Sequence, residues 1–325
     1  MVSFSRDKFI EKPAGLVKFS HDDELLVAGV GSNVMVVARE GRLLHELATP
    51  SNGTEKFGGS VWCVAVDRRS KLVAAGHEDG RVSVWSLDSG VLLSRENVFH
   101  QQVLGIEFVA DIQPKGYSTS QSGGKVASGP LIAVCCGTTA SLWKAHDLRK
   151  YSTLPGGETQ WRRGTDDLQT IAAEYDGQYI AAGRRSGHVH VWKAERGGTY
   201  ELFRTLSISR SDGGVQRVLL HKSRNMSKTL YVAFESVIRA WSIPDFDEVA
   251  AIPTGGTKDI ALSEDGSVIV SAHLGLSRVR LWNLNGEMLG DESFEDGILG
   301  IAATRDGALL ALRDDEGQLL RLQQG

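Results

Sequence analysis

The sequence has few cysteines. Its 325 residues include three, Cys63, Cys135 and Cys136, which are too few and of the wrong parity for a disulfide framework. Because free cysteine behaves as a small apolar residue, we expect all three to be reduced thiols in or near the core. The chain therefore does not belong with the small disulfide-stapled secreted proteins.

Long hydrophobic runs are also lacking. No apolar stretch approaches the roughly 18 residues that a membrane-spanning helix needs. The first residues, MVSFSRDKFIEKP, carry charges throughout and have no uninterrupted apolar segment of the kind found in a secretory signal. We therefore expect an intracellular protein, most simply a cytoplasmic one, and leave a nuclear or organellar location open.

Charge of one sign is not in excess. The chain carries 36 Lys and Arg against 40 Asp and Glu, which gives a formal net charge of −4. No overall positive field would draw it to nucleic acid or to acidic membranes. Proline is scarce, with 7 residues, whereas glycine is abundant, with 37, and this balance is typical of many tight turns between short strands.

What the sequence does contain is a tryptophan that recurs at the end of a short apolar run. Such runs end at Trp85, Trp143, Trp192, Trp241 and Trp282, with weaker copies ending at Val37 and Leu322. The spacing is roughly 40 to 60 residues, and a repeat of about this length with one aromatic strand end per unit is typical of a β-propeller. A single unit cannot bury its own apolar face, so the units must pack side by side.

Each repeat can be divided into four strands. In the second repeat, alternating apolar residues at 61–67, 71–77, 81–87 and 91–97 are separated by turn residues such as EDG and DSG. The same division predicts one all-β domain over 1–325, with blades at about 14–50, 58–99, 102–155, 167–208, 214–253, 257–294 and 297–325.

The last repeat has only three strands before the chain ends. Segment 2–9 belongs to no other repeat, and we predict that it supplies the missing outer strand of this last blade. Such a strand would seal the ring and leave no open sheet edge. The sequence therefore predicts a seven-bladed β-propeller with four-stranded antiparallel blades.

These repeats resemble those of the WD-repeat propellers over essentially the whole chain. The resemblance rests on Asp-Gly turns, on strands such as RVSVW and HVHVW, and on the tryptophans that end them. It is degenerate, because none of the five tryptophans is followed by Asp and the Gly-His pair that usually opens a repeat is missing. The resemblance implies an interaction platform in which the side-chain hydrogen-bond network of well-formed repeats is incomplete in most blades.

The sequence shows no catalytic set. His188 and His190 face one side of a strand, but no Cys, Asp or Glu stands at a spacing that would complete a metal site. The glycine-rich segments lack a phosphate-binding or dinucleotide-binding fingerprint, and no G-x-S-x-G nucleophile elbow is present. We therefore expect no enzyme activity, no cofactor and no metal.

One group of candidate protein-binding residues lies around the fourth blade. In a propeller, the loops that enter each blade and the turns between its second and third strands share one face, here called the top. On the top of the fourth blade we expect a basic cluster of Trp161, Arg162, Arg163, Arg184, Arg185 and Arg210. Trp and Arg are the residues that dominate binding hot spots.

A second candidate group is the ring of residues that open the first strand of each blade, at the mouth of the central channel. By alignment of the repeats these are Gly15, Trp62, Leu104, Gln169, Gln216, Lys258 and Leu299. On the opposite face, here called the bottom, we expect basic residues in blades three to five. We also expect a Ser/Gly-rich insertion at 111–130 that is mobile by itself.

The sequence favours a monomeric propeller that acts as a non-catalytic scaffold or adaptor subunit of a multi-subunit protein complex. Two alternatives stay open. Trp161-Arg162-Arg163-Gly164 resembles the motif of the phosphoinositide-binding propellers of autophagy, which implies that Arg162 and Arg163 bind a membrane lipid. The chain is also similar in general character to the non-catalytic propeller subunit of the tRNA guanine methyltransferase, which implies an RNA-modifying or RNA-processing complex that binds nucleic acid only as a whole.

Overall fold

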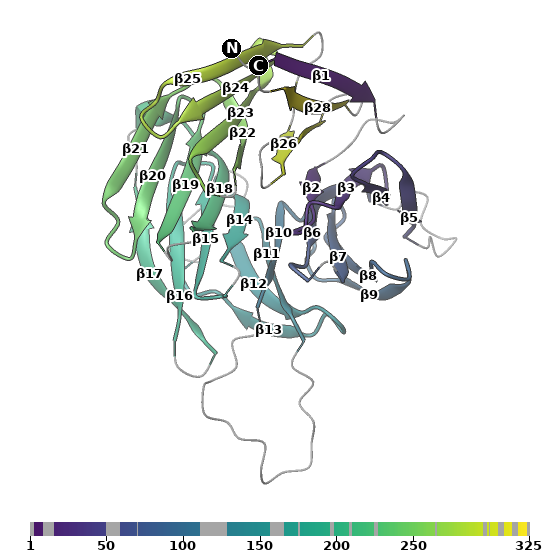
Figure 1. Ribbon diagram of the computed structural model, residues 1–325. Helices are drawn as coiled ribbons and strands as arrows, with labels where there is room; N and C mark the ends of the chain where they lie inside the picture. Colours follow the sequence, from purple (N-terminus) through teal and green to yellow (C-terminus); the bar gives the residue numbers. More distant parts are fainter. Residues whose placement is uncertain are drawn as a thin grey trace.

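The computed structural model describes most of the chain. The described residues are 3–8, 16–49, 59–69, 71–110, 129–156, 166–174, 176–195, 198–207, 210–223, 227–263, 265–294, 298, 300–304, 309–313 and 318–323. They form seven four-stranded antiparallel sheets, arranged around a common centre (Figure 1). The predicted all-β propeller with four-stranded antiparallel blades is confirmed.

The first four sheets follow one another along the chain. The first comprises β2 (Val17–Phe19), β3 (Leu25–Val30), β4 (Asn33–Ala38) and β5 (Leu43–Leu47), and the second comprises β6 (Val61–Val66), β7 (Leu72–His77), β8 (Arg81–Ser86) and β9 (Leu92–Asn97). The third comprises β10 (Gly105–Val109), β11 (Leu131–Cys136), β12 (Thr139–Lys144) and β13 (Lys150–Thr153), and the fourth comprises β14 (Leu168–Ala173), β15 (Tyr179–Arg184), β16 (Val189–Ala194) and β17 (Tyr200–Leu206).

The remaining sheets continue this order. The fifth comprises β18 (Val215–Lys222), β19 (Lys228–Phe234), β20 (Val237–Ile243) and β21 (Glu248–Pro253), and the sixth comprises β22 (Thr257–Leu262), β23 (Val268–His273), β24 (Arg278–Asn283) and β25 (Met288–Ser293). The seventh comprises β26 (Gly300–Ala303), β27 (Leu309–Arg313), β28 (Gln318–Gln323) and, outermost, β1 (Ser3–Lys8). Two short 3-10 turns, η1 (Arg210–Asp212) and η2 (Leu274–Leu276), lie in connecting segments.

The two ends of the chain meet in the seventh sheet. Strand β1 pairs antiparallel with β28, so that Phe4 lies opposite Leu322. Strand β26 also contacts β2 of the first sheet and β22 of the sixth. The residue Ala302 belongs to the same apolar cluster as Val17 and Leu26. The last sheet therefore packs against both of its neighbours.

The core lies between the sheets rather than within one of them. Every residue of β7 and β11 is buried, whereas the outer strand β17 is mostly exposed. The tryptophans that end the third strands pack into this core, and Trp85 and Trp192 are fully buried. This gradient explains why the inner strands are continuous apolar runs and the outer strands are polar.

Glycines in the second strands permit close contact between successive sheets. A methyl group at Gly29 would overlap Val61, one at Gly76 would overlap Val103, and one at Gly183 would overlap Val215. Each valine lies at or just before the first strand of the next sheet. The same small-to-large contact therefore recurs at three sheet boundaries.

Two further sequence predictions concern the core and the insertion. The three cysteines are free and buried, as expected of reduced core thiols. Of the predicted insertion at 111–130, residues 111–128 lie outside the described residues. Among the described elements, no helix is long or apolar enough to cross a membrane.

Candidate binding surface at the channel mouth

Four of the residues predicted to ring the channel mouth share a backbone irregularity. In four of the first strands the pairing register shifts by one residue, between Val61 and Cys63 and at the equivalent places in the other three. The extra residues at these shifts are Trp62, Gln169, Gln216 and Lys258. A bulge of this kind redirects a side chain out of the alternating pattern of the strand. The four side chains therefore leave their strands at equivalent points.

These residues differ in chemistry and exposure. Trp62 is 39 % exposed although Cys63 beside it is buried, and Lys258 is exposed, whereas Gln169 and Gln216 are half-buried. Leu104, half-buried, precedes β10, and its backbone N–H donates to Cys135 O at 3.0 Å. The remaining predicted members, Gly15 and Leu299, lie outside the described residues.

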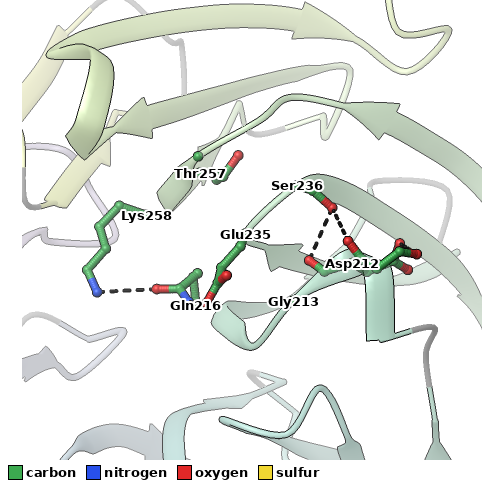
Figure 2. Close-up of a pocket in the computed structure, with 9 residues that line it drawn as sticks. Asp212, Gly213, Gln216, Glu235, Ser236, Thr257 and Lys258 are labelled. Carbon is green, nitrogen blue, oxygen red and sulfur yellow. Dashed lines mark hydrogen bonds between the residues drawn. The ribbon is translucent and has the colours of Figure 1, made fainter.

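A shallow pocket of about 500 Å³ adjoins this rim between the fifth and sixth sheets. It is lined by Ser211, Asp212, Gly213, Gln216, Glu235, Ser236, Gly256, Thr257 and Lys258 (Figure 2). Lys258 Nζ donates to Gln216 Oε1 at 3.2 Å, and Gln216 Nε2 lies 3.4 Å from Glu235 Oε1. Two of the predicted mouth residues thus form a polar chain along one side of the pocket.

The opposite side of the pocket is held in place by a buried acid. Asp212 is 7 % exposed, and Arg239 Nε donates to its Oδ2 at 3.1 Å. The Ser236 hydroxyl donates to the carbonyl oxygens of Ser211 and Asp212, at 3.1 and 3.2 Å (Figure 2). This side therefore presents fixed backbone and hydroxyl groups, while the ionisable groups Glu235 and Lys258 stay exposed.

Buried polar side chains hold the loops that lead to the bulges. In the second sheet, His77 Nδ1 donates to Gly59 O at 3.0 Å and its Nε2 accepts from Ser83 Oγ at 3.1 Å. In the sixth, His273 Nδ1 donates to Gly255 O at 2.9 Å. Each carbonyl belongs to the residue three positions before a mouth residue, Trp62 or Lys258. These histidines therefore position the rim.

In the fourth sheet an arginine takes the same role. Arg184 is fully buried and donates from Nε to His190 Nε2 at 2.8 Å and from Nη1 to Asp166 O at 2.9 Å. His190 Nδ1 in turn donates to Thr205 Oγ1 at 3.1 Å. Burial, followed by the Arg184 charge, lowers the pKa of His190 to about 4. The imidazole is therefore neutral, as its acceptor role requires.

The predicted basic cluster of the fourth blade is not assembled as expected. Arg184 ends strand β15 inside the protein, so the expectation that it contributes to an open arginine cluster is wrong. A carbonyl-lined interior and a neutral imidazole satisfy its donors without solvent. Arg185 is exposed in the following turn, Arg210 begins η1, and Trp161, Arg162 and Arg163 lie outside the described residues.

Sequence reasoning misses these polar contacts because it predicts exposure for a charged residue next to a turn. The one available signal was the position of the residue: His77, Arg184 and His273 all end the second strand of their sheet. The incompleteness implied for most blades stays a prediction, because Trp143 Nε1 donates to Ser141 Oγ at 2.8 Å and Trp192 Nε1 to Pro155 O at 2.7 Å. Trp282 Nε1 donates to Ser271 Oγ at 2.8 Å, whereas Trp85 Nε1 has no hydrogen-bond acceptor among the described residues.

The arrangement offers groups suited to recognition. Within the part of the chain that is described, no three His, Cys, Asp or Glu side chains lie close enough together to hold a metal ion. The pocket holds hydroxyls, the amide of Gln216, two carboxylates and the ammonium of Lys258, which can bind a polar peptide by hydrogen bonds. Elsewhere on the rim the exposed indole of Trp62 offers a large apolar contact.

Comparison with known proteins fits this geometry. A family model for the WD domain, G-beta repeat, matches residues 51–86, which include β6, β7 and β8. The matched segment corresponds to one WD repeat, and the fold of the chain is that of a β-propeller. This propeller is similar to the crystal structure of the Cps50 (Swd1) β-propeller domain of Myceliophteria thermophila, with a TM-score of 0.76 and 14 % sequence identity over 98 % of this chain and 99 % of that one.

The comparisons establish the fold of the propeller and little else. As many as 1738 solved chains match it, so the likeness does not distinguish among the roles that this fold serves. No curated protein matches the sequence significantly. WD-repeat propellers are typically non-catalytic interaction scaffolds, and the residues of this propeller must supply any finer assignment.

Proposed function

We propose that this propeller is a non-catalytic, intracellular scaffold or adaptor subunit that binds a partner protein across the top face, at the channel mouth. The observation that carries the proposal is the set of four bulges. They place an indole, two amides and an ammonium at equivalent points around one rim. Four equivalent distortions with different side chains suit one partner that contacts several sheets at once.

We further propose that the seven sheets are seven blades of one closed ring. The pairing of β1 with β28 and the contacts of β26 with β2 support this proposal. A closed ring gives the rim a fixed shape. Little conformational freedom of the rim is therefore lost when a partner binds.

Trp62 is the residue whose loss should weaken this interface most. Exposed aromatic residues at the centre of an interface commonly contribute 2 kcal/mol or more, which corresponds to roughly thirtyfold in affinity. The tagged chain would be purified from its own cells, and the associated proteins would be quantified by mass spectrometry. We expect Trp62→Ala to reduce a stoichiometric partner by about tenfold or more relative to the bait.

The matched control is Leu289→Ala, because Leu289 is 40 % exposed on the outer strand β25 and Trp62 is 39 % exposed. It should leave the partner unchanged. An equal loss in both variants, or no loss in either, would place the interface elsewhere. Liposome binding without protein partners would favour the phosphoinositide alternative, and co-purified RNA would favour the RNA-complex alternative.

A further inference from the structure

A second and larger pocket lies on the bottom face. Its volume is about 890 Å³, within the range of roughly 300–1,000 Å³ found for ligand pockets. Its walls come from the first three sheets and from the ends of the first strands of the fourth and fifth, at Ala173 and Leu220. It therefore opens beside the bottom end of the central channel, away from the rim that carries Trp62.

The deep part of this pocket is apolar. Phe19, Val66 and Phe108 are buried side chains at the bottom ends of the first strands. At the edge, Leu93 of strand β9 is 42 % exposed. An apolar side chain of a ligand could be removed from water here, which favours binding.

The entrance carries an excess of positive charge. Arg68, Arg69 and Lys71 are exposed in the turn between β6 and β7, against one exposed acid, Asp88. Arg68 is oriented by His21, since its Nε donates to His21 Nε2 at 2.7 Å.

Deeper in the pocket the charges are balanced or disfavoured. Lys18 forms an ion pair with Glu107, and burial raises the pKa of Asp67 and so opposes its charged form. The chain as a whole carries −4, so this cationic entrance is opposite in sign to the rest of the molecule.

Two other cations on the bottom face lie beside carboxylates. Lys222 Nζ lies 2.9 Å from Asp176 Oδ2, and Lys228 Nζ lies 2.7 Å from Glu174 Oε2. These pairs remove part of the basic character that the sequence predicted for the fifth blade. The entrance of the pocket keeps its excess of positive charge.

We propose that this pocket binds an acidic peptide segment of a second partner protein, with an apolar side chain in the pocket and carboxylates at the entrance. Arginine suits this role because its planar guanidinium can bind a carboxylate through two hydrogen bonds. A single-stranded nucleic acid would require exposed aromatic rings for stacking, and the aromatic residues here, Phe19 and Phe108, are buried. A concave pocket likewise does not suit a flat lipid surface.

This inference does not rest on the proposed function at the channel mouth. The two sites lie on opposite faces and share no residue. If both bind, the propeller joins two partners, and if one fails, the other is unaffected.

The test measures fluorescence anisotropy of a labelled synthetic peptide of alternating Glu and Leu, titrated with the full-length chain. We expect Arg68→Glu/Arg69→Glu to weaken binding by about tenfold or more. Higher salt should weaken wild-type binding, because the entrance charges are exposed. Trp62→Ala should bind as the wild type does, which separates this site from the channel mouth.

Matched variants control for charge and for surface hydrophobicity. Arg149→Glu/Lys150→Glu reverses two exposed adjacent cations outside the pocket and should change affinity less than about twofold. Leu93→Asp should weaken binding, whereas Leu289→Asp, at similar exposure, should not. Circular dichroism would verify that each variant is folded.

Four results would overturn the proposal. They are no binding of the Glu-Leu peptide by the wild-type chain, equal losses in the two double variants, equal binding of a peptide made of Glu alone, and tighter binding of a single-stranded oligonucleotide. Equal binding of the Glu-only peptide would show that the site recognises charge alone. Tighter binding of the oligonucleotide would show that it is a nucleic-acid site.

Discussion

Three buried polar side chains occupy the same place in alternate sheets. His77, Arg184 and His273 each end a second strand, and each donates a hydrogen bond to a carbonyl of the loop that enters the sheet. Burial lowers the pKa of both His77 and His273. A neutral imidazole can both donate and accept, so protonation would cost each histidine the bond in which it accepts.

The buried, neutral His190, which accepts from Arg184, predicts a loss of stability in mild acid. The pKa of His190 is about 4 in the folded protein and 6.5 as its ordinary value. The unfolded chain therefore binds a proton that the folded one does not as the pH falls from 6.5 to 4, and the free energy of unfolding decreases. The upper limit for this residue is about 3.5 kcal/mol, at about 1.4 kcal/mol per pKa unit.

The measurement is urea unfolding at pH 7 and pH 5 for the wild type and His190→Gln. The amide of Gln can accept from Arg184 and donate to Thr205 without titrating. We expect the variant to be less stable at pH 7 and to show a smaller difference between the two pH values. The comparison between proteins is needed because burial raises the pKa of Glu174 to about 7, which acts in the opposite direction. An identical pH dependence in both would contradict this assignment, and His146→Gln, at an exposed site, is the control.

At the level of the element, close contact between neighbouring sheets depends on glycine, which has no side chain. Gly183 in β15 faces Val215 at the start of β18, and a Cβ there would also lie 3.0 Å from Val218 Cγ2. Protein interiors are too closely packed to accept an added methyl group without movement. The spacing of the fourth and fifth sheets is therefore set at this contact.

Gly183→Ala should reduce the free energy of unfolding by about 1–3 kcal/mol through overpacking, measured by urea denaturation. Adding Val215→Ala removes the methyl groups that the new Cβ would overlap, so the double variant should recover part of the loss relative to Val215→Ala alone. The control is Gly275→Ala, because a Cβ at Gly275 meets nothing within 4 Å. A larger loss at Gly275 than at Gly183 would show that the contact does not set the spacing.

The sequence predicted those elements whose signal is local. The strand that ends in Trp85 was placed at 81–87 and is observed at Arg81–Ser86, because apolar periodicity and a turn glycine define it. Trp62, Gln169, Gln216 and Lys258 were correctly aligned as equivalent residues, although the bulge that makes them equivalent was not foreseen. Arg184 was misplaced, since nothing local indicates that carbonyls from distant loops will satisfy a buried guanidinium.

At the level of the whole molecule, the pairing of β1 with β28 joins the two ends of the chain. Without β1, the seventh sheet would expose the edge of β28, and unpaired edges promote association of chains. Pairing of the two ends also closes a loop of nearly the whole chain, and these contacts must offset the entropic cost of that closure. The first strand should therefore contribute to both stability and solubility.

Deletion of residues 1–8 should lower the melting temperature by about 5 °C or more and produce soluble dimers or aggregates, as measured by differential scanning fluorimetry and light scattering. A synthetic peptide with the sequence VSFSRDKF, residues 2–9, added in trans should restore both properties, whereas the reversed sequence should not. An unchanged melting temperature with a monomeric profile would show that the strand is dispensable.

The first strands connect the two faces, and their length has a consequence for any pair of bound partners. Trp62 lies near one end of β6, and Val66, in the bottom pocket, lies at the other. Four residues of extended chain span roughly 13 Å. Two proteins held at these places would be separated by a rigid gap of about this width, too narrow for a third folded domain and short enough for their own loops to meet around the rim. The length of the first strands would then fix the distance between the two partners in the assembly.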